Sequence, residues 1–451
     1  MSAPPRAEAP PSAHAYWVVA CLMLASAFSF LDRLVLSLLI DPIRAALDLT
    51  DSEVSLLAGA AFASCYVLFA FVFGRWVDRH SRRNAIILGI TLWSLATAGC
   101  GLATSFWLLF IMRAAVGVGE GSVNPVAYSM IADYFPPARR GLAMAIFACG
   151  ASVGGGLAIL AGGEVVQWAT TTQADLPLAP WQMVFVLVGL PGLLVALLIA
   201  LTVREPARRL TAAEDEQPPS WAEAAAHVGR HARAILPMFA GFSFIAVNGY
   251  AFQVWGPAYF MRLHGLSPAD VGLLFGLGYG VLGTMGVVGG GILSDRLVRR
   301  GRIDAPITVS LQAAVAAGIL FIGAYLASDF ALAAILFCAA VTAASMIGGL
   351  QAAMVQSLSP GRMRGVMAAL YTTAITIAGL GVAPTLTAFA SDYVFGGPTG
   401  IGKALALTTA ISVALVALSI LWGRPAARRL AETLAQPMSS PPSTGSTTPV
   451  T

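Results

Sequence analysis

Long apolar segments recur along this chain and constrain its fold more than any other feature. A helix needs about 20 apolar residues to cross the hydrocarbon core of a membrane, which is about 30 Å thick. Each segment is long enough for that crossing. The predicted fold is therefore an all-α membrane protein of twelve transmembrane helices, at residues 16–40, 54–73, 84–103, from 106 onward, 142–163, 181–203, 233–259, 268–291, 305–327, 330–355, 366–390 and 401–423.

Composition agrees with a membrane protein and excludes a soluble domain. Hydrophobic residues make up 57% of the chain, charged residues only 11%, and the mean hydropathy is +0.78. The net charge of +4 comes almost entirely from arginines that cluster in loops on one side, so it indicates no nucleic-acid partner. Five cysteines fall within apolar segments without paired spacing, which predicts no disulfide. The proline-rich start does not have the pattern of a signal peptide.

The distribution of basic residues predicts the orientation and the domain limits. Only Arg44, Arg262 and Lys403 fall on one side, and the other loops hold the remaining arginines, so both termini are predicted to be cytoplasmic. Within the linker, Ser220 and Glu223 have capping-box spacing and favour a short helix along the membrane surface. The predicted parts are a disordered tail at 1–15, a six-helix bundle at 16–203, a linker at 204–232, a second bundle at 233–424 and a disordered tail at 425–451.

Two loop sequences occur twice, once in each half. GRWVDRHSRR at 74–83 recurs as GILSDRLVRR at 291–300, each after the second apolar segment of its half. PPARRG at 136–141 is echoed by PGRMRG at 360–365, each before the fifth segment. Two homologous six-helix halves joined by a linker are typical of transporters with parallel repeats.

Charged residues lie inside the fourth segment. Arg113, Glu120 and Asn124 are spaced so that a helix places them on roughly one face. An arginine and a glutamate within a membrane span indicate a functional site, with a purely structural ion pair as the alternative. The glycines between them, at 117, 119 and 121, allow a neighbouring backbone to approach closely.

The duplicated loops resemble the signature of the major facilitator superfamily, and the resemblance covers essentially the whole membrane region. In that family these loops act as a cytoplasmic latch that closes when the protein faces outward; the alternative is that their arginines only set topology. The resemblance places the latch at Asp78, Arg79, Arg82, Arg83, Asp295, Arg296, Arg299 and Arg300.

Four further motifs look like the spinster-like branch of this superfamily. They are FLDR at 30–33, RAAVGVGEG at 113–121, IADYFPPARRG at 131–141 and WGP at 255–257. The sequence departs from that branch at Ser29 and Phe30, where Asn and Tyr are common. Animal members are linked to export of sphingosine-1-phosphate or lysophospholipids, so the resemblance implies an amphiphilic substrate and favours Asn124 as a headgroup contact.

Depth along the helices suggests which membrane charges meet. Asp32 and Arg113 lie at similar depth, each about 11 Å from the outer surface, so they are expected to pair. Glu120 lies about 10 Å nearer the middle, where such transporters bind substrate, and Arg33 either lines the cavity or contacts the fifth helix. The second half has no ionisable group clearly within the bilayer, so it is expected to hold the neutral or apolar part of a ligand.

These observations predict a proton-coupled secondary transporter of an amphiphilic organic anion, working by alternating access in the inner membrane. Proton coupling is assigned to Asp32 and Glu120. Symport, antiport and uniport remain open, as do a symporter of small organic or sugar acids and a non-transporting receptor or scaffold. Substrate contacts are expected at Arg33, Arg113, Asn124, Tyr128, Asn248, Trp255 and Tyr371.

No enzymatic activity, cofactor or metal is predicted. GASVG at 150–154 fits a nucleophile-elbow pattern but lies inside a helix without a histidine at membrane depth. All five histidines fall in tails or loops, which argues against a metal cluster. The expected partners are a small-molecule or lysolipid substrate, protons and the lipid bilayer, with the protein as a monomer.

Overall fold

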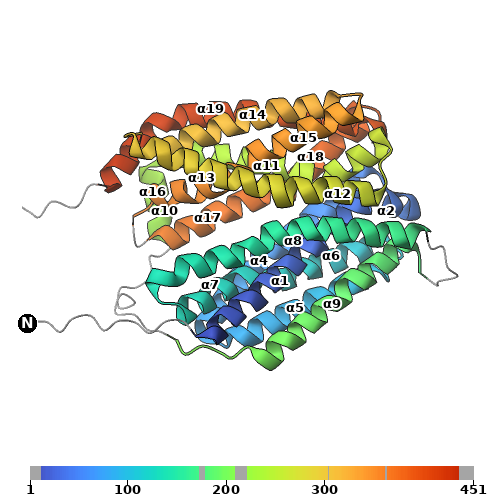
Figure 1. Ribbon diagram of the computed structural model, residues 1–451, viewed down its shortest axis with the longest axis horizontal. Coiled ribbons are helices and arrows are strands. Elements are labelled where there is room, and N and C mark those ends of the chain that lie inside the picture. Colours follow the sequence, from blue (N-terminus) through green and yellow to red (C-terminus); the bar gives the residue numbers. More distant parts are fainter. Residues whose placement is uncertain (1–11, 172–177, 209–220, 303, 361–362, 436–451) are drawn as a thin grey trace, which may run out of the picture.

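The computed structural model describes residues 12–171, 178–208, 221–302, 304–360 and 363–435, and these residues form helices without any strand. They group into two bundles that lie side by side along the long axis of the molecule (Figure 1). The first bundle contains α1 (Ala13–Leu38), α2 (Ile40–Leu47), α3 (Asp51–Ser55), η1 (Leu56–Ala60), α4 (Ala61–Arg79), α5 (Arg82–Cys100), α6 (Phe106–Glu120), α7 (Val123–Tyr134), α8 (Pro137–Thr171) and α9 (Pro180–Thr202).

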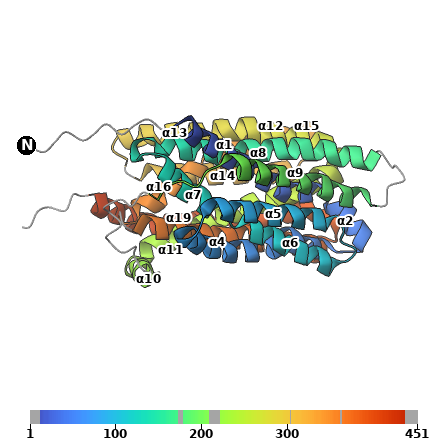
Figure 2. The ribbon, with the colours of Figure 1, turned by 90° about the horizontal axis from the view of Figure 1, so that it is seen from below.

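The second half of the structure begins within the predicted linker. It contains α10 (Trp221–Arg230), α11 (Ala232–His264), α12 (Pro268–Leu277), η3 (Gly278–Gly283), α13 (Thr284–Arg299), α14 (Ala305–Leu326), α15 (Phe330–Ser345), α16 (Gly348–Ser357), α17 (Arg364–Thr376), η5 (Ile377–Val382), α18 (Ala383–Phe389), η6 (Ala390–Val394), η7 (Pro398–Gly400) and α19 (Ile401–Ala435). Seen from below, the long helices of both bundles run roughly parallel to one another (Figure 2).

Many of these helices are suited to a membrane. In the described part of the chain, eleven helices are long and apolar enough to cross one. The predicted third segment forms α5, which is not among the eleven and carries Arg82 and Arg83 in its first turn. Large apolar side chains such as Trp107, Leu194 and Ile335 are more than half exposed, as expected on a surface that faces hydrocarbon.

Glycines bring the helices of the first bundle into backbone contact. A Cβ added at Gly117 would lie 2.4 Å from the carbonyl oxygen of Phe62 in α4. One added at Gly119 would lie 2.5 Å from the carbonyl oxygen of Gly89 in α5. The close approach predicted for the central stretch is confirmed, and it places the charged end of α6 against two neighbouring helices.

The two bundles meet along α8 and α12, again through small residues. A Cβ at Gly156 would lie 3.2 Å from the carbonyl oxygen of Gly276, and one at Gly163 would lie 2.5 Å from the carbonyl oxygen of Pro268. Figure 1 shows α8 and α12 side by side between the bundles. At these two positions the helices touch through backbone atoms.

Each end of the linker is fixed to a different bundle. Glu205 follows α9 and accepts hydrogen bonds from the backbone N–H and the Nε of Arg82 in α5, at 3.2 and 2.9 Å. The predicted surface helix is α10, in which the buried His227 lies 3.1 Å from the carbonyl oxygen of Leu358 in the second bundle. Ser220, proposed as its cap, lies outside the described residues.

The last helix is longer than the sequence indicated. A tail was expected from residue 425, but α19 continues to Ala435. Its extension is stabilised by packing and charge: Ala427 and Leu430 are buried against the second bundle, and Arg424 Nη2 lies 2.6 Å from Asp304 Oδ2. The remainder of both predicted tails, at 1–11 and 436–451, lies outside the described residues.

Candidate functional site

An ion pair joins α1 to the end of α6. Arg33 Nε lies 2.6 Å from Glu120 Oε2, and the hydroxyl of Ser29 donates to the same oxygen at 2.6 Å. Ser29 and Arg33 are one turn apart on α1, and Arg33 Nη2 also donates to Ser29 Oγ at 3.2 Å. The Glu120 side chain is fully buried and that of Arg33 is 17% exposed. A charge-assisted pair of this kind is strong because water is excluded from it.

Aromatic rings surround the guanidinium of Arg33. Its Cζ lies 4.8 Å from the ring centroids of both Phe62 and Tyr66 on α4, and 5.2 Å from that of Phe30. Asn124 Nδ2 donates to the Tyr66 hydroxyl at 3.0 Å. Cation–π contacts favour the charged guanidinium in this position. Asn124, predicted as a headgroup contact, therefore holds one of the rings that pack on Arg33.

The expected pair between Asp32 and Arg113 is wrong. Asp32 Oδ2 accepts a hydrogen bond from Thr97 Oγ1 on α5 at 3.1 Å, and Arg113 Nε donates to the carbonyl oxygen of Leu57 at 3.3 Å. Asp32 Oδ1 and Arg113 Nη1 have no hydrogen-bond partner among the described residues, although both side chains are buried. The reason is rotation about the axis of α1, which turns Asp32 toward α5 and Arg33 toward α6.

The main cavity, of about 340 Å³, lies in the second bundle. None of the side chains that line it is charged, and most are apolar or aromatic, among them Phe252, Tyr279 and Phe321. Polar groups are supplied by Asn248, Tyr250, Gln253, Ser345, Gln351 and Ser412. The sequence-based expectation that the second half receives a neutral or apolar group agrees with this lining.

Two of the predicted polar contacts are found in or beside this cavity. Asn248 lines it, and its Oδ1 accepts a hydrogen bond from Thr409 Oγ1 at 2.8 Å. Tyr371 lies behind the lining and donates to Gln351 Oε1 at 2.7 Å. The amide of Gln351 is therefore oriented by Tyr371 on the neighbouring helix.

The cavity and the ion pair are adjacent. Phe30 lines the cavity and also packs on Arg33. Gln253 lines the same cavity and a second one of about 20 Å³, whose wall includes Arg33. Gln253 therefore lies between the main cavity of the second bundle and the small cavity that contacts Arg33 of the first.

Two predicted substrate contacts lie elsewhere. Trp255 is fully buried; its Nε1 donates to the carbonyl oxygen of Pro384 at 2.9 Å, and its ring lies 5.7 Å from Arg262 Cζ. It does not line the main cavity. Tyr128 is 53% exposed and packs edge-on against Phe147. No hydrogen bond or ring contact joins either of them to Arg33 or Glu120 among the described residues.

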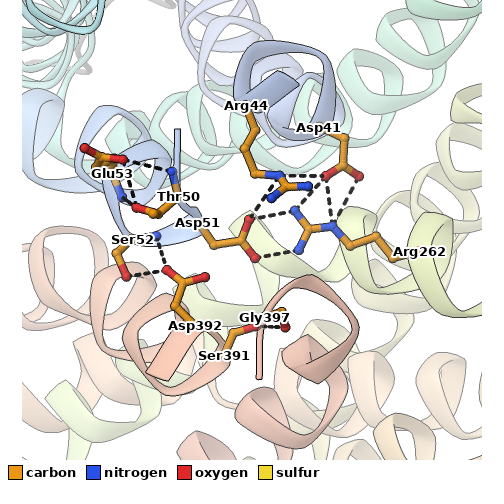
Figure 3. A network of polar contacts seen from close by, with 10 residues as sticks. All are labelled: Asp41, Arg44, Thr50, Asp51, Ser52, Glu53, Arg262, Ser391, Asp392 and Gly397. Carbon is orange, nitrogen blue, oxygen red and sulfur yellow. Dashed lines mark hydrogen bonds and ion pairs between the residues drawn. The ribbon is translucent and has the colours of Figure 1, made fainter. Parts of the chain in front are cut away.

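A cluster of four charged residues joins the bundles beyond Trp255 (Figure 3). Arg262 of α11 binds Asp41 and Asp51 of the first bundle, with an N–O distance of 2.6 Å to each, and Arg44 lies 3.8 Å from Asp51. We call Asp41, Arg44, Asp51 and Arg262 the interbundle cluster. Next to it, Asp392 Oδ2 accepts hydrogen bonds from the backbone N–H and the hydroxyl of Ser52.

The sequence interpretation missed the acids of this cluster. It placed Arg44 and Arg262 in loops opposite the termini and did not single out Asp41, Asp51 or Asp392. One signal was available, because these arginines are two of only three basic residues assigned to that side. Basic residues that occur against the positive-inside trend are candidates for contact with an acidic partner.

The latch loops lie at the other end of the bundles. Arg82 pairs with Asp133 of α7 and with Glu205, and Arg83 Nη2 donates to the carbonyl oxygen of Ala200. All of these partners belong to the first bundle or to the start of the linker. No ion pair joins the two loops in the part of the chain that the structure describes, and the side chain of Asp78 lies outside that part. Exposed positions are occupied by Arg79, Asp295, Arg296, Arg299 and Arg300.

Comparison with known proteins identifies the family. The pattern of the Major Facilitator Superfamily matches residues 22–384. "Protein spinster homolog 1" of Bos taurus is 30% identical over 329 residues, which is 69% of this chain and 60% of that protein. An "MFS-type efflux pump" of Mycolicibacterium smegmatis is 28% identical over 63% of this chain and 64% of its own length. The chain thus matches less than two thirds of the length of these relatives.

A solved structure of a bacterial homolog of the human lysosomal transporter spinster, in an inward-facing and unoccupied conformation, has a similar fold. Its TM-score is 0.81 at 24% identity, and the match covers 95% of this chain and all of that one. The duplicated latch loops, the two bundles and these matches agree with one another. The chain therefore belongs to the major facilitator superfamily of membrane transporters and, within it, is similar to the spinster proteins.

Proposed function

We propose that this protein is a proton-coupled transporter that moves an amphiphilic organic anion, such as a lysophospholipid or a sphingoid phosphate, across the inner membrane by alternating access. In this proposal twelve helices cross the membrane and both termini are cytoplasmic. The observation that carries the proposal is the position of the Arg33–Glu120 pair beside an apolar cavity without charged lining. An anionic group would bind Arg33, and the apolar part would occupy the cavity of the second bundle.

Proton coupling follows from competition for Arg33. An anionic headgroup that binds the guanidinium leaves Glu120 without its cation, in a place where the carboxylate is fully buried. A buried carboxylate without a partner costs several kcal/mol, so proton uptake by Glu120 becomes favourable. Substrate and proton would then assist each other's binding, which predicts movement in the same direction.

Asp32 is proposed as the second protonation site. Its carboxylate is buried, accepts a hydrogen bond from Thr97 and lies beyond ion-pair distance of any described arginine. A neutral carboxylic acid fits this environment better than an anion, because no described cation lies within ion-pair distance of the buried carboxyl group. In this proposal Asp32 holds a proton in the present conformation and releases it when the bundles rearrange.

Two features support an inward-facing conformation. The interbundle cluster holds the bundles together at the end opposite the termini, whereas the described latch residues form no ion pair between the two loops. In addition, the similar solved structure is inward-facing. Closure of the latch and opening of the cluster would complete the transport cycle.

A symporter of small organic or sugar acids is the second candidate. The "Hexuronate transporter" of Bacillus subtilis is 26% identical over 430 residues, which is 91% of this chain and 96% of that protein. A hexuronate carboxylate would bind Arg33 in the same way, and the amides of Asn248 and Gln351 could bind its hydroxyl groups. The apolar lining of the cavity favours the amphiphile.

Proton flux in proteoliposomes tests the proposal. A pH dye inside the vesicles reports proton movement when lysophospholipids, sphingoid phosphates or hexuronates are added to wild type, Glu120→Gln and Glu164→Gln. Glu164 lies exposed on α8, so Glu164→Gln makes the same chemical change away from the site and serves as the control. We expect one substrate class to move protons in wild type and Glu164→Gln but not in Glu120→Gln.

Other outcomes separate the alternatives. Proton movement with hexuronates alone would favour the sugar-acid symporter. Movement of labelled substrate without a proton signal, unchanged in Glu120→Gln, would show a uniporter whose charged pair is structural. If no substrate class moves and labelled ligands still bind, a receptor or scaffold would be the better assignment.

A further inference from the structure

Two arginines of the interbundle cluster face the same two carboxylates but differ in their contacts (Figure 3). Arg262 donates to Asp41 at 2.6 and 2.9 Å and to Asp51 at 2.6 and 2.8 Å. Arg44 Nε lies 4.0 Å from Asp41 and 3.8 Å from Asp51, too far for a hydrogen bond. This Nε is buried and has no hydrogen-bond partner among the described residues.

The four residues do not belong to the same rigid body. Asp41 and Arg44 lie on α2 and Asp51 begins α3, all in the first bundle, whereas Arg262 is near the end of α11 in the second. Separation of the bundles at this end must withdraw Arg262 from both acids. The side chain of Asp51 is fully buried in the closed arrangement, so it would lose its strongest partner in the first stage of opening.

Arg44 is positioned to replace Arg262 as the cation that binds the two acids. It is three residues from Asp41 on the same helix, a spacing at which side chains meet without any backbone change. A movement of about 1 Å would bring its guanidinium into charge-assisted hydrogen bonds with Asp51, whose usual length is about 2.8 Å. In the closed arrangement that movement is opposed because Arg262 already occupies the acids and repels a second cation.

We propose that Arg44 is a reserve counter-ion for Asp41 and Asp51, which exchanges with Arg262 when the bundles separate. The inference rests on the alternating-access mechanism proposed above. It implies that two arginines in contact with the same acids act in opposite directions. Arg262 stabilises the closed arrangement, and Arg44 stabilises the open one, because only the difference in contacts between two states shifts their equilibrium.

Other contacts across this interface do not distinguish the two arginines. Asp392 binds Ser52, and Ser55 Oγ donates to Thr385 Oγ1 at 3.1 Å. Both bonds break on opening whichever arginine is present. They therefore contribute equally to the free energy of opening in every variant. Opposite effects of Arg44 and Arg262 would therefore not come from these two bonds.

The test measures how often this interface opens. Ser55 is fully buried in the interface, so a cysteine there reacts with a neutral, hydrophilic maleimide only in the open arrangement. Its reaction rate is compared with that of a cysteine at the exposed Ala46, in full-length protein without the five native cysteines. When opening and closing are fast, the ratio of the rates reports the open fraction, even if that fraction is small.

Substitutions of the two arginines are expected to change the labelling rate in opposite directions. Arg262→Gln should raise the rate at Ser55→Cys by about tenfold or more, since a buried pair is broken. Arg44→Gln should lower it by about threefold or more, and Arg44→Lys, which keeps the charge, should restore a rate near wild type. Lys403→Gln removes an exposed cation predicted on the same side and should leave the rate unchanged.

Two failures are distinguishable. A rate that rises or stays constant in Arg44→Gln, while Arg262→Gln accelerates the reaction, overturns the counter-ion exchange and leaves alternating access intact. If Ser55→Cys does not react in wild type or in Arg262→Gln, while Ala46→Cys does, the interface does not open, and both the exchange and the proposed mechanism are wrong.

Discussion

Arg33 Nε lies 2.6 Å from Glu120 Oε2, whereas Asp32, the preceding residue, faces Thr97 on a different helix. Successive residues of a helix point about 100° apart, so two neighbours on α1 reach two separate partners. Asp32 and Glu120, both buried, therefore have different surroundings: Glu120 has a cation and Asp32 has none within ion-pair distance among the described residues. This difference leads to opposite expectations for their neutral variants.

Removal of either partner of the Arg33–Glu120 pair should destabilise the protein. Glu120→Gln or Arg33→Gln leaves one charge buried without a partner, a change that costs about 3–5 kcal/mol. The double variant removes both charges and should recover a large part of that loss. Denaturant unfolding in detergent, arranged as a double-mutant cycle, measures the coupling. Strictly additive losses would show that the two side chains do not interact.

Asp32→Asn should behave differently. The amide oxygen can still accept the hydrogen bond from Thr97, and no ion pair is lost, so we expect the free energy of unfolding to change by less than about 1 kcal/mol. Under the proposed mechanism this variant should bind substrate but lose proton movement. Substrate binding and dye-reported proton flux are measured together. A large loss of stability would mean that Asp32 is charged and paired through water.

Backbone contacts at the end of α6 predict a strong effect of one methyl group. Gly119→Ala places a Cβ 2.5 Å from the carbonyl oxygen of Gly89 and 2.7 Å from the backbone nitrogen of Trp93, so we expect a loss of about 3 kcal/mol. The control is Gly74→Ala, where the added Cβ meets no atom within 4 Å. There the higher helix propensity of alanine should raise stability by up to about 1 kcal/mol. Equal effects at both sites would contradict the packing of α6 on α5.

The start of the linker should loosen in acid. Burial raises the pKa of Glu205, but hydrogen bonds from the Arg83 N–H, the Arg82 guanidinium and the Ser81 hydroxyl outweigh it and lower this pKa from 4.5. A pKa that is lower in the folded state means that the stabilising contribution is complete above about pH 4.5. It is lost as the pH falls through the lowered value.

Stability measured against pH checks this expectation. Between pH 7 and 3, wild type should lose more stability than Glu205→Gln, which cannot titrate. Above pH 4.5 the variant should be less stable than wild type, because a neutral amide replaces the carboxylate that binds Arg82. Parallel curves for the two proteins would show that Glu205 does not carry the effect.

The sequence predicted the architecture better than the pairing of charges. Apolar length and the duplicated loops are local properties, and they indicated the helices and the two related halves. The pairing of Asp32 with Arg113 was inferred from the depth of the two residues in the membrane. Depth alone does not determine how a helix is rotated about its axis. For α1 that rotation is set by contacts distant in sequence, such as that of Gly154 in α8 with Ala27.

The interbundle cluster was missed for a related reason. Asp41 and Arg44 belong to α2, which begins after a break at Leu39 that the apolar pattern of the first segment does not reveal. Their partner Arg262 is more than two hundred positions later in the chain. Trp255 was likewise expected in the cavity, but its Nε1 donates to the backbone carbonyl of Pro384, which lies 129 positions later, at the start of α18.

The seam between α8 and α12 has a mechanical consequence. At Gly156, Gly163 and Gly272 the nearest facing atoms are backbone, and at Gly276 they are the carbonyl oxygen of Gly156 and the side chain of Leu160. Few interlocking side chains at these glycines oppose a rotation of one bundle against the other about this line. The seam can therefore serve as a pivot with a low barrier to motion, and a bulky residue at Gly276 should slow the exchange between conformations.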